Sequence, residues 1–220
     1  MGNYMEKALP VRACYALKEP VNNRILILGL DAAGKTSLLQ RALAKENVEP
    51  NFDVNPTVGF NVEMCQLDPT KRANYALWDV GGQDKIRSLW RHYYSGATGL
   101  IFVIDSTDVD RIDEAAEALK VILADQEMKS IPVLIFANKQ DDDTALTVEN
   151  ITEKIGFNSA TQERRKWVIQ GCSAISGEGV SEGLRSLHKL LQAKTQMEKK
   201  QNNNFGKSNL RRSFRIKPRK

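Results

Sequence analysis

Residues 29–36 read GLDAAGKT and follow directly after a short apolar run. They fit the pattern G-x-x-x-x-G-K-[ST], in which glycines let backbone N–H groups curl around phosphate oxygens. Lys35 would bring a mobile positive charge to the β- and γ-phosphates, and the hydroxyl of Thr36 would bind Mg²⁺. A helix beginning here would also point the positive end of its dipole at the anion. The alternative is a glycine-rich turn between a strand and a helix, but we interpret the segment as a phosphate-binding loop.

A second segment, residues 138–141 (NKQD), offers chemistry that would choose the base. The carboxylate of Asp141 can accept hydrogen bonds from N1–H and the 2-amino group of guanine, whereas adenine would leave it unpaired. Lys139 has an aliphatic stem that can pack on the face of a base. An acidic loop continuing to Asp143 is the alternative. Because the segment ends a buried strand, where parallel sheets bind their ligands, we interpret Asn138, Lys139 and Asp141 as guanine-binding residues.

A third segment, residues 79–84 (DVGGQD), places a carboxylate, two glycines and a glutamine after another apolar run. Two adjacent glycines cost backbone entropy, so this position needs the conformational freedom that they give. A surface turn would satisfy that need without any chemistry. Taken alone, these residues leave the choice between a turn and a functional loop open.

Four short segments without alternating polar residues predict strands buried on both faces, which is typical of a parallel sheet covered by helices. Helical patterns follow three of them, and this alternation predicts an α/β fold with a doubly wound sheet. The expected strands are 24–28, 99–104, 132–137 and 167–171, and the expected helices are 36–45, 111–128 and 179–194. Residues 60–67 alternate apolar and polar side chains, and with residues 73–80 they predict an antiparallel hairpin at one edge of a mostly parallel, six-stranded sheet.

The 220 residues suit one domain with an appendage. Residues 198–220 hold nine Lys or Arg and one Glu, a charge of 9 − 1 = +8, so residues 1–197 carry 5 − 8 = −3 of the net charge of +5. From about Thr195 the chain reads as a polar, basic extension without helical periodicity. The three cysteines have no spacing that indicates a disulfide framework or a zinc site. Since no apolar run could cross a membrane and no signal peptide is recognisable, we expect a soluble intracellular protein.

Four segments in this order and spacing resemble the ADP-ribosylation factor (Arf) and Arf-like family of small GTPases: GLDAAGKT, NPTVGFNVE, WDVGGQDKIRSLWRHYY and NKQD. The third is specific, because Ras-type relatives lack the double glycine and the helix after it. The resemblance covers roughly residues 20–193. It implies a P-loop GTPase domain at residues 21–195, between an N-terminal membrane-interacting arm at 1–20 and a basic flexible tail at 196–220.

The resemblance also implies a role for each site residue. Gln83 would be catalytic and would orient the attacking water, and Gly82 would offer its N–H to the γ-phosphate. Mg²⁺ would be bound by Thr36, by Thr57 when the γ-phosphate is present, and by Asp79 through water. The residues expected to bind GTP or GDP are Asp31, Ala32, Ala33, Gly34, Lys35, Thr36, Ser37, Thr57, Gly82, Asn138, Lys139, Asp141, Ser173 and Ala174, the last two in a loop that would meet the base through backbone N–H groups.

The expected protein partners are a guanine nucleotide exchange factor, a GTPase-activating protein and effectors in membrane trafficking. Hydrolysis should be slow without help, because Val54, Asn55 and Pro56 stand where the Gα relatives carry an arginine. An activating protein would supply that arginine in trans. The alternative function is a nucleotide-gated effector-binding module with negligible hydrolysis.

Both ends of the chain predict attachment to a membrane surface. Gly2 is the expected myristoylation site, although Glu6 breaks the usual pattern and an unmodified arm is the alternative. One acyl chain binds only marginally, so the basic residues of 210–220 would add attraction to anionic lipids. A nuclear-import signal or a solvated tail are the alternatives for this segment. The protein would be cytoplasmic and peripherally attached to Golgi or plasma membrane, with a nuclear fraction if the tail acts as an import signal, and we expect no nucleic-acid partner.

Overall fold

The computed structural model describes residues 23–44, 50, 52, 55–71, 73–157 and 165–213, with side chains described as far as residue 200. The predictions for Gly2, for the N-terminal arm and for residues 214–220 therefore lie outside the described residues. Within the described part, no helix has the length and apolarity needed to cross a membrane.

Six strands form one sheet in the order β2-β3-β1-β4-β5-β6. The pair β2 and β3 is antiparallel, and the other neighbouring pairs are parallel. This arrangement confirms the predicted fold class, with the hairpin at one edge of the sheet. The strands are β1 (Arg24–Leu28), β2 (Phe60–Cys65), β3 (Tyr75–Val80), β4 (Ala97–Asp105), β5 (Val133–Asn138) and β6 (Trp167–Gly171).

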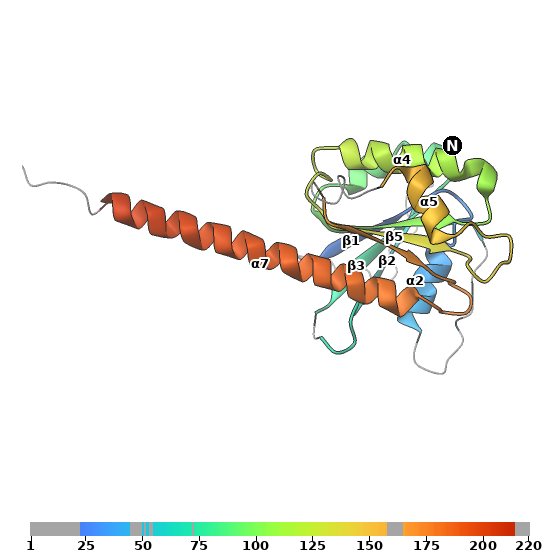
Figure 1. Ribbon diagram of the computed structural model, residues 1–220, viewed down its shortest axis with the longest axis horizontal. Coiled ribbons are helices and arrows are strands. Elements are labelled where there is room, and N and C mark those ends of the chain that lie inside the picture. The colour runs from blue at the N-terminus through green and yellow to red at the C-terminus, as the bar shows by residue number, and fades with distance from the viewer. Residues whose placement is uncertain are drawn as a thin grey trace, which may run out of the picture.

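Helices cover both faces of the sheet (Figure 1). On one face lie α4 (Ile112–Ala124) and α5 (Val148–Ile155), and on the other lie α2 (Lys35–Leu43) and the first turns of α7 (Val180–Ser213). The other helices in the described part are short, namely α3 (Asp84–Arg87) and the 3₁₀ turns η1 (Trp90–Tyr93) and η2 (Val109–Arg111).

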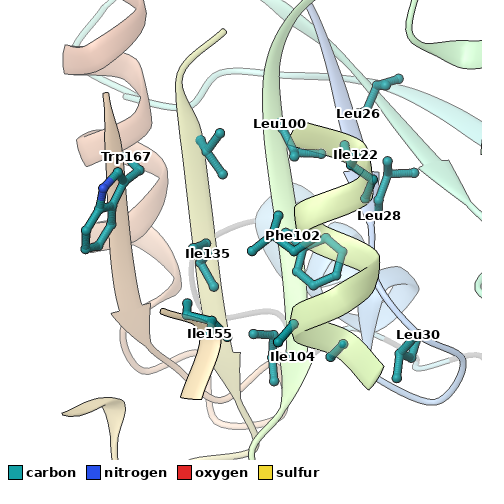
Figure 2. Packing of buried hydrophobic residues seen from close by; sticks show 14 of the residues in the cluster. Leu26, Leu28, Leu30, Leu100, Phe102, Ile104, Ile122, Ile135, Ile155 and Trp167 are labelled. Carbon is teal, nitrogen blue, oxygen red and sulfur yellow. The ribbon is translucent and has the colours of Figure 1, made fainter. Parts of the chain in front are cut away.

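The central strands are buried on both faces because alternate side chains point to opposite sides of a strand. Figure 2 shows Phe102 and Ile135 on the side of the sheet that faces α4, in the same hydrophobic cluster as Ile122 of that helix. Ile101 belongs instead to the cluster on the other face, with Leu187 of α7. This two-sided packing fixes the strand ends that carry the candidate site.

A buried polar contact ties β3 to α7. The hydroxyl of Tyr75 and Nδ1 of His188 lie 3.0 Å apart and share a hydrogen bond, and the two rings meet edge to face. The two residues are only 2% and 4% exposed. Because a polar group buried without a partner costs free energy, each residue depends on the other.

The C-terminal helix is longer than the sequence predicted. We expected helical structure to end near Thr195, whereas α7 continues to Ser213, and Figure 1 shows its distal part extending away from the sheet. The extension contains no proline and several good helix formers, including Gln196, Met197 and Glu198. Apolar periodicity reports which face of a helix is buried, and the described side chains of the extension, residues 196–200, are exposed, so the lack of a period did not mark the end of the helix.

Candidate functional site

A pocket of about 400 Å³ opens where the loops after β1, β3, β5 and β6 meet. Three lining residues were not predicted from the sequence: Asn55, Pro56 and Ile175. Three predicted residues are buried and do not line the pocket: Ala33, Asp79 and Ser173. The predicted residues that line the pocket are Asp31, Ala32, Gly34, Lys35, Thr36, Ser37, Thr57, Gly82, Gln83, Asn138, Lys139, Asp141 and Ala174. The structure thus brings together residues that are up to 144 positions apart, from Asp31 to Ile175 (175 − 31 = 144).

Lys35 provides the positive charge of this pocket. It is the first residue of α2 and is 6% exposed. Its Nζ donates to the carbonyl oxygens of Gly29 at 2.9 Å and Leu30 at 2.6 Å. Burial lowers the pKa of Lys35 to about 8, although the carboxylates of Asp79 and Asp31 act in the opposite direction. A buried ammonium group at a helix N-terminus fits an anionic ligand such as phosphate, because the anion would offset the cost of burying the charge.

Three side chains with hard oxygen donors, Thr36, Thr57 and Asp79, lie beside Lys35. Thr36 Oγ1 donates to Asp79 Oδ2 at 2.7 Å and lies 2.8 Å from Thr57 Oγ1. Asp79 is fully buried, and its Oδ1 has no hydrogen-bond partner among the described residues. Burial raises the pKa of Asp79, while the hydrogen bond from Thr36 and the charge of Lys35 lower it. Hydroxyl and carboxylate oxygens are the ligands that Mg²⁺ prefers, and a cation would pair with the orphaned carboxylate oxygen, so these residues fit the metal.

The double glycine allows two close backbone approaches. A Cβ atom on Gly81 would lie 2.6 Å from the carbonyl oxygen of Thr57, and one on Gly82 would lie 2.5 Å from that of Gly29. Nε1 of Trp90 donates to the carbonyl oxygen of Gly81 at 2.9 Å. The double-glycine segment therefore packs between the phosphate loop and the loop that carries Thr57. This packing excludes the alternative that residues 79–84 form only a surface turn.

Gln83 follows the double glycine, is the N-cap residue of α3 and lines the pocket. Its carbonyl oxygen accepts from the N–H groups of Ile86 and Arg87. Nη1 of Arg87 in turn donates to Oε1 of Glu114 on α4 at 2.7 Å. The backbone at Gln83 is therefore fixed, while its exposed side chain is free to meet a water in the pocket.

At the other sequence motif, Asn138 joins two loops. Its Nδ2 donates to the carbonyl oxygen of Ala33 at 2.9 Å, and its Oδ1 accepts from the N–H of Ala174 at 3.0 Å. Asn138 is 1% exposed. The N–H of Ala174, which the sequence assigned to the base, thus has a protein partner in this structure.

Lys139 and Asp141 lie on the pocket wall. The backbone of Lys139 is left-handed, with φ of 66°, and its Nζ lies 2.5 Å from Oδ2 of Asp105. Asp105 is a functional candidate that the sequence interpretation missed, although its place at the end of a predicted strand was a usable signal. Gln140 was also missed, and its Nε2 donates to Ser106 Oγ and to the Leu146 carbonyl oxygen, each at 2.9 Å, which holds the loop after β5.

Comparison with known proteins agrees with this geometry. Residues 13–191 match the ADP-ribosylation factor family. The chain is similar to the solved structure of the Arl6 BBS3 small GTPase from Trypanosoma brucei with bound nucleotide analogue GppNp, with 28% sequence identity and a TM-score of 0.67. The match covers 78% of this chain and 98% of that chain. With the sheet order, the phosphate loop and the double-glycine segment in place, this chain belongs to the ADP-ribosylation factor family of small GTPases.

Proposed function

We propose that the protein is a GTP/GDP-dependent switch that binds guanine nucleotide with Mg²⁺, hydrolyses GTP slowly and recruits effectors in membrane trafficking. One observation carries this proposal. The hydroxyls of Thr36 and Thr57 meet the buried carboxylate of Asp79 beside a pocket that is also lined by the residues of the phosphate loop and of NKQD. Such a site suits a nucleotide whose phosphates and base are both contacted within one pocket.

The residues have distinct roles in this proposal. Lys35 would neutralise phosphate charge, and Gln83 would orient the attacking water. Thr36, Thr57 and Asp79 would hold Mg²⁺, which when bound bridges phosphate oxygens and offsets their charge. Gly82 would present its N–H to the γ-phosphate, so the segment after β3 would respond to the presence of that phosphate.

The expectation of slow hydrolysis is supported by the types of residue that line the pocket. None of its lining residues, in the part of the chain that the structure describes, is an arginine. An arginine supplied in trans by a GTPase-activating protein accelerates related reactions by about 10³ to 10⁵. Single-turnover GTP hydrolysis with and without an activating protein of this family, with Gln83→Leu as the inactive control, tests the proposal. An unassisted turnover within seconds would contradict the slow rate.

The absence of a pocket arginine also keeps a second function open, a nucleotide-gated effector-binding module with negligible hydrolysis. If the activating protein accelerates hydrolysis in the wild type but not in Gln83→Leu, the switch is supported. Turnover that stays undetectable in both would favour the binding module.

Guanine selectivity is tested at Asp141. Affinities for GDP, GTP and ATP should show a strong preference for guanine in the wild type, and Asp141→Asn should abolish most of that preference because an amide cannot accept both guanine N–H groups in the same way. Unchanged selectivity in this variant would refute the assignment of the base site.

The membrane part of the proposal concerns Gly2, which lies outside the described residues, and residues 210–220, of which the structure describes only the backbone of 210–213. Myristoylation of Gly2 and attraction of the basic residues of 210–220 to anionic lipids would together hold the protein on a Golgi or plasma membrane. Mass spectrometry of the protein from its natural source tests the first signal. An unacylated N-terminal glycine would remove it from the proposal.

A further inference from the structure

We propose that Arg41 is a positioning residue that sets the orientation of the loop at residues 172–176 and thereby favours guanine over adenine. Arg41 lies in the last turn of α2, the helix that begins with Lys35 and Thr36. It is outside the sequence motifs, and only the fold brings it to this loop. The inference rests on the proposed binding of guanine nucleotide.

The guanidinium group of Arg41 holds two consecutive carbonyl groups. Its Nε donates to the carbonyl oxygen of Ala174 at 3.0 Å, and its Nη2 donates to that of Ile175. The side chain runs along the loop, because a Cβ atom on Gly177 would lie 3.2 Å from Cδ of Arg41. The planar fork of an arginine can make both bonds at once, whereas a lysine ammonium group cannot match this geometry.

A second anchor holds the same loop from another side. The N–H of Ala174 donates to Oδ1 of Asn138 at 3.0 Å, while the N–H of Ser176 donates to Oγ of Ser173 at 3.0 Å within the loop. Asn138 therefore fixes one edge of the peptide chain at Ala174 and Arg41 fixes the other. The bond to Asn138 fixes the peptide group before Ala174, and the bond from Nε of Arg41 fixes the orientation of the peptide group between Ala174 and Ile175.

That orientation has a consequence for the base. A peptide group is planar and trans, so its N–H points opposite to its C=O. Because Arg41 holds the carbonyl oxygens of Ala174 and Ile175, those acceptors are directed to α2, and the N–H of Ile175 is directed the other way. Ala174 and Ile175 both line the pocket. The loop therefore offers the pocket a donor, which suits the oxygen at position 6 of guanine and disfavours the amino group at position 6 of adenine.

The ring of Phe52 lies against the guanidinium group of Arg41. The Cζ atom of Arg41 lies 5.4 Å from the centre of its ring. An aromatic face at this distance attracts the guanidinium group and limits its access to water, which strengthens its hydrogen bonds.

The test compares three diphosphates on Arg41→Ala, on Arg41→Lys and on Arg165→Ala. Arg165 is a matched control, because its guanidinium also donates to two carbonyl oxygens, but the residues that it holds, Met128 and Leu123, do not line the pocket, whereas Ala174 and Ile175 do. GDP, inosine diphosphate and ADP distinguish recognition at position 6 of the purine from recognition at position 2. Inosine diphosphate keeps the 6-oxygen and lacks the 2-amino group that Asp141 would read.

We expect Arg41→Ala to lower the GDP-to-ADP affinity ratio about tenfold, since one charged hydrogen bond is worth about that factor. The GDP-to-inosine diphosphate ratio should stay within about twofold of the wild type. Arg41→Lys, which keeps the charge and loses the fork, should show the same selective loss if Arg41→Ala does not fold. Arg165→Ala should change neither ratio, even if its melting temperature falls.

Two results would overturn the inference. One is an unchanged GDP-to-ADP ratio in a folded Arg41 variant, and the other is an equal loss in Arg165→Ala, which would mean that destabilisation alone acts on selectivity. A wild-type protein without any preference for GDP over ADP would instead refute the proposed function, so the two failures are distinguishable.

Discussion

Gly82→Ala would separate the response to the γ-phosphate from the binding of the rest of the nucleotide. A Cβ atom at this position would lie 2.5 Å from the carbonyl oxygen of Gly29, the carbonyl carbon of Leu30 and Nζ of Lys35. Ordinary van der Waals contact begins near 3.4 Å, so the new atom must retreat by 3.4 − 2.5 = 0.9 Å. Two of the three neighbours are backbone atoms of the phosphate loop, and it is the segment after β3 that must move.

The size of the effect follows from that displacement. Overpacking of this kind costs about 1–3 kcal/mol, which corresponds to roughly a 5- to 150-fold change in an equilibrium. The cost falls on the conformation in which Gly82 touches the phosphate loop, where its N–H would meet the γ-phosphate. The α- and β-phosphates would still be held by the loop and by Lys35, so GDP binding should change by less than about threefold.

The assay is a competition titration of GDP and of a non-hydrolysable GTP analogue against a fluorescent GDP. Gly99→Ala is the matched control, because its Cβ atom would meet its nearest neighbour, a leucine side-chain atom, at 3.3 Å. We expect the ratio of GTP-analogue affinity to GDP affinity to fall in Gly82→Ala and to stay unchanged in Gly99→Ala. An equal loss of both nucleotides in Gly82→Ala would refute the reasoning, because it would mean that the phosphate loop itself had been displaced.

Three further predictions follow from other parts of the molecule. Burial lowers the pKa of Lys35 from 10.5 to about 8, so the ligand-free folded state releases this proton before the unfolded state does. Urea titrations should show its stability rising with pH between those values, while GDP affinity falls over the same range because phosphate needs the protonated amine. Lys35→Met should show neither trend. Tyr75→Phe should lower the free energy of unfolding by about 1–3 kcal/mol, because it leaves His188 buried without its partner, and adding His188→Leu should recover part of that loss. Deletion of residues 205–220, which hold seven Lys or Arg, should weaken sedimentation with anionic liposomes and leave neutral liposomes unaffected, at about 1 kcal/mol per basic residue near the surface. Unchanged binding to anionic liposomes would exclude the tail as a membrane signal.

The parts of the fold that the sequence predicted are those with local signals. The apolar runs of β1, β4 and β5 are largely buried, and the phosphate loop has a fixed spacing of glycines and lysine. The prediction that residues 167–171 are buried on both faces was wrong, because β6 is an edge strand and only Trp167 in it is buried. The helix α5 was missed although Thr147 caps it through a hydrogen bond from the N–H of Asn150 and Gly156 ends it in a left-handed conformation. Its capping signals were present, but its eight residues are too few for a clear apolar period.

The parts of the site that could not be predicted depend on long-range contacts. Arg41 and Ala174 are 133 positions apart, and no local pattern relates them. The bond from the N–H of Ala174 to Asn138 likewise exists only because β5 and β6 are neighbours in the sheet. Asp79 was predicted as a metal ligand, but its complete burial and its unpaired Oδ1 come from the packing of β3 and could not be inferred from its place at the end of a strand.

The length of α7 gives the molecule a spacer of defined reach. Among the described side chains of α7, which end at residue 200, Leu191 is the last in the core, and the helix continues to Ser213, 213 − 191 = 22 residues further. At 1.5 Å per residue this extension spans about 33 Å. A partner bound near Ser213 would therefore be held about 33 Å along the helix axis from Leu191. Deleting one whole turn from this extension would shorten the reach by about 5.4 Å.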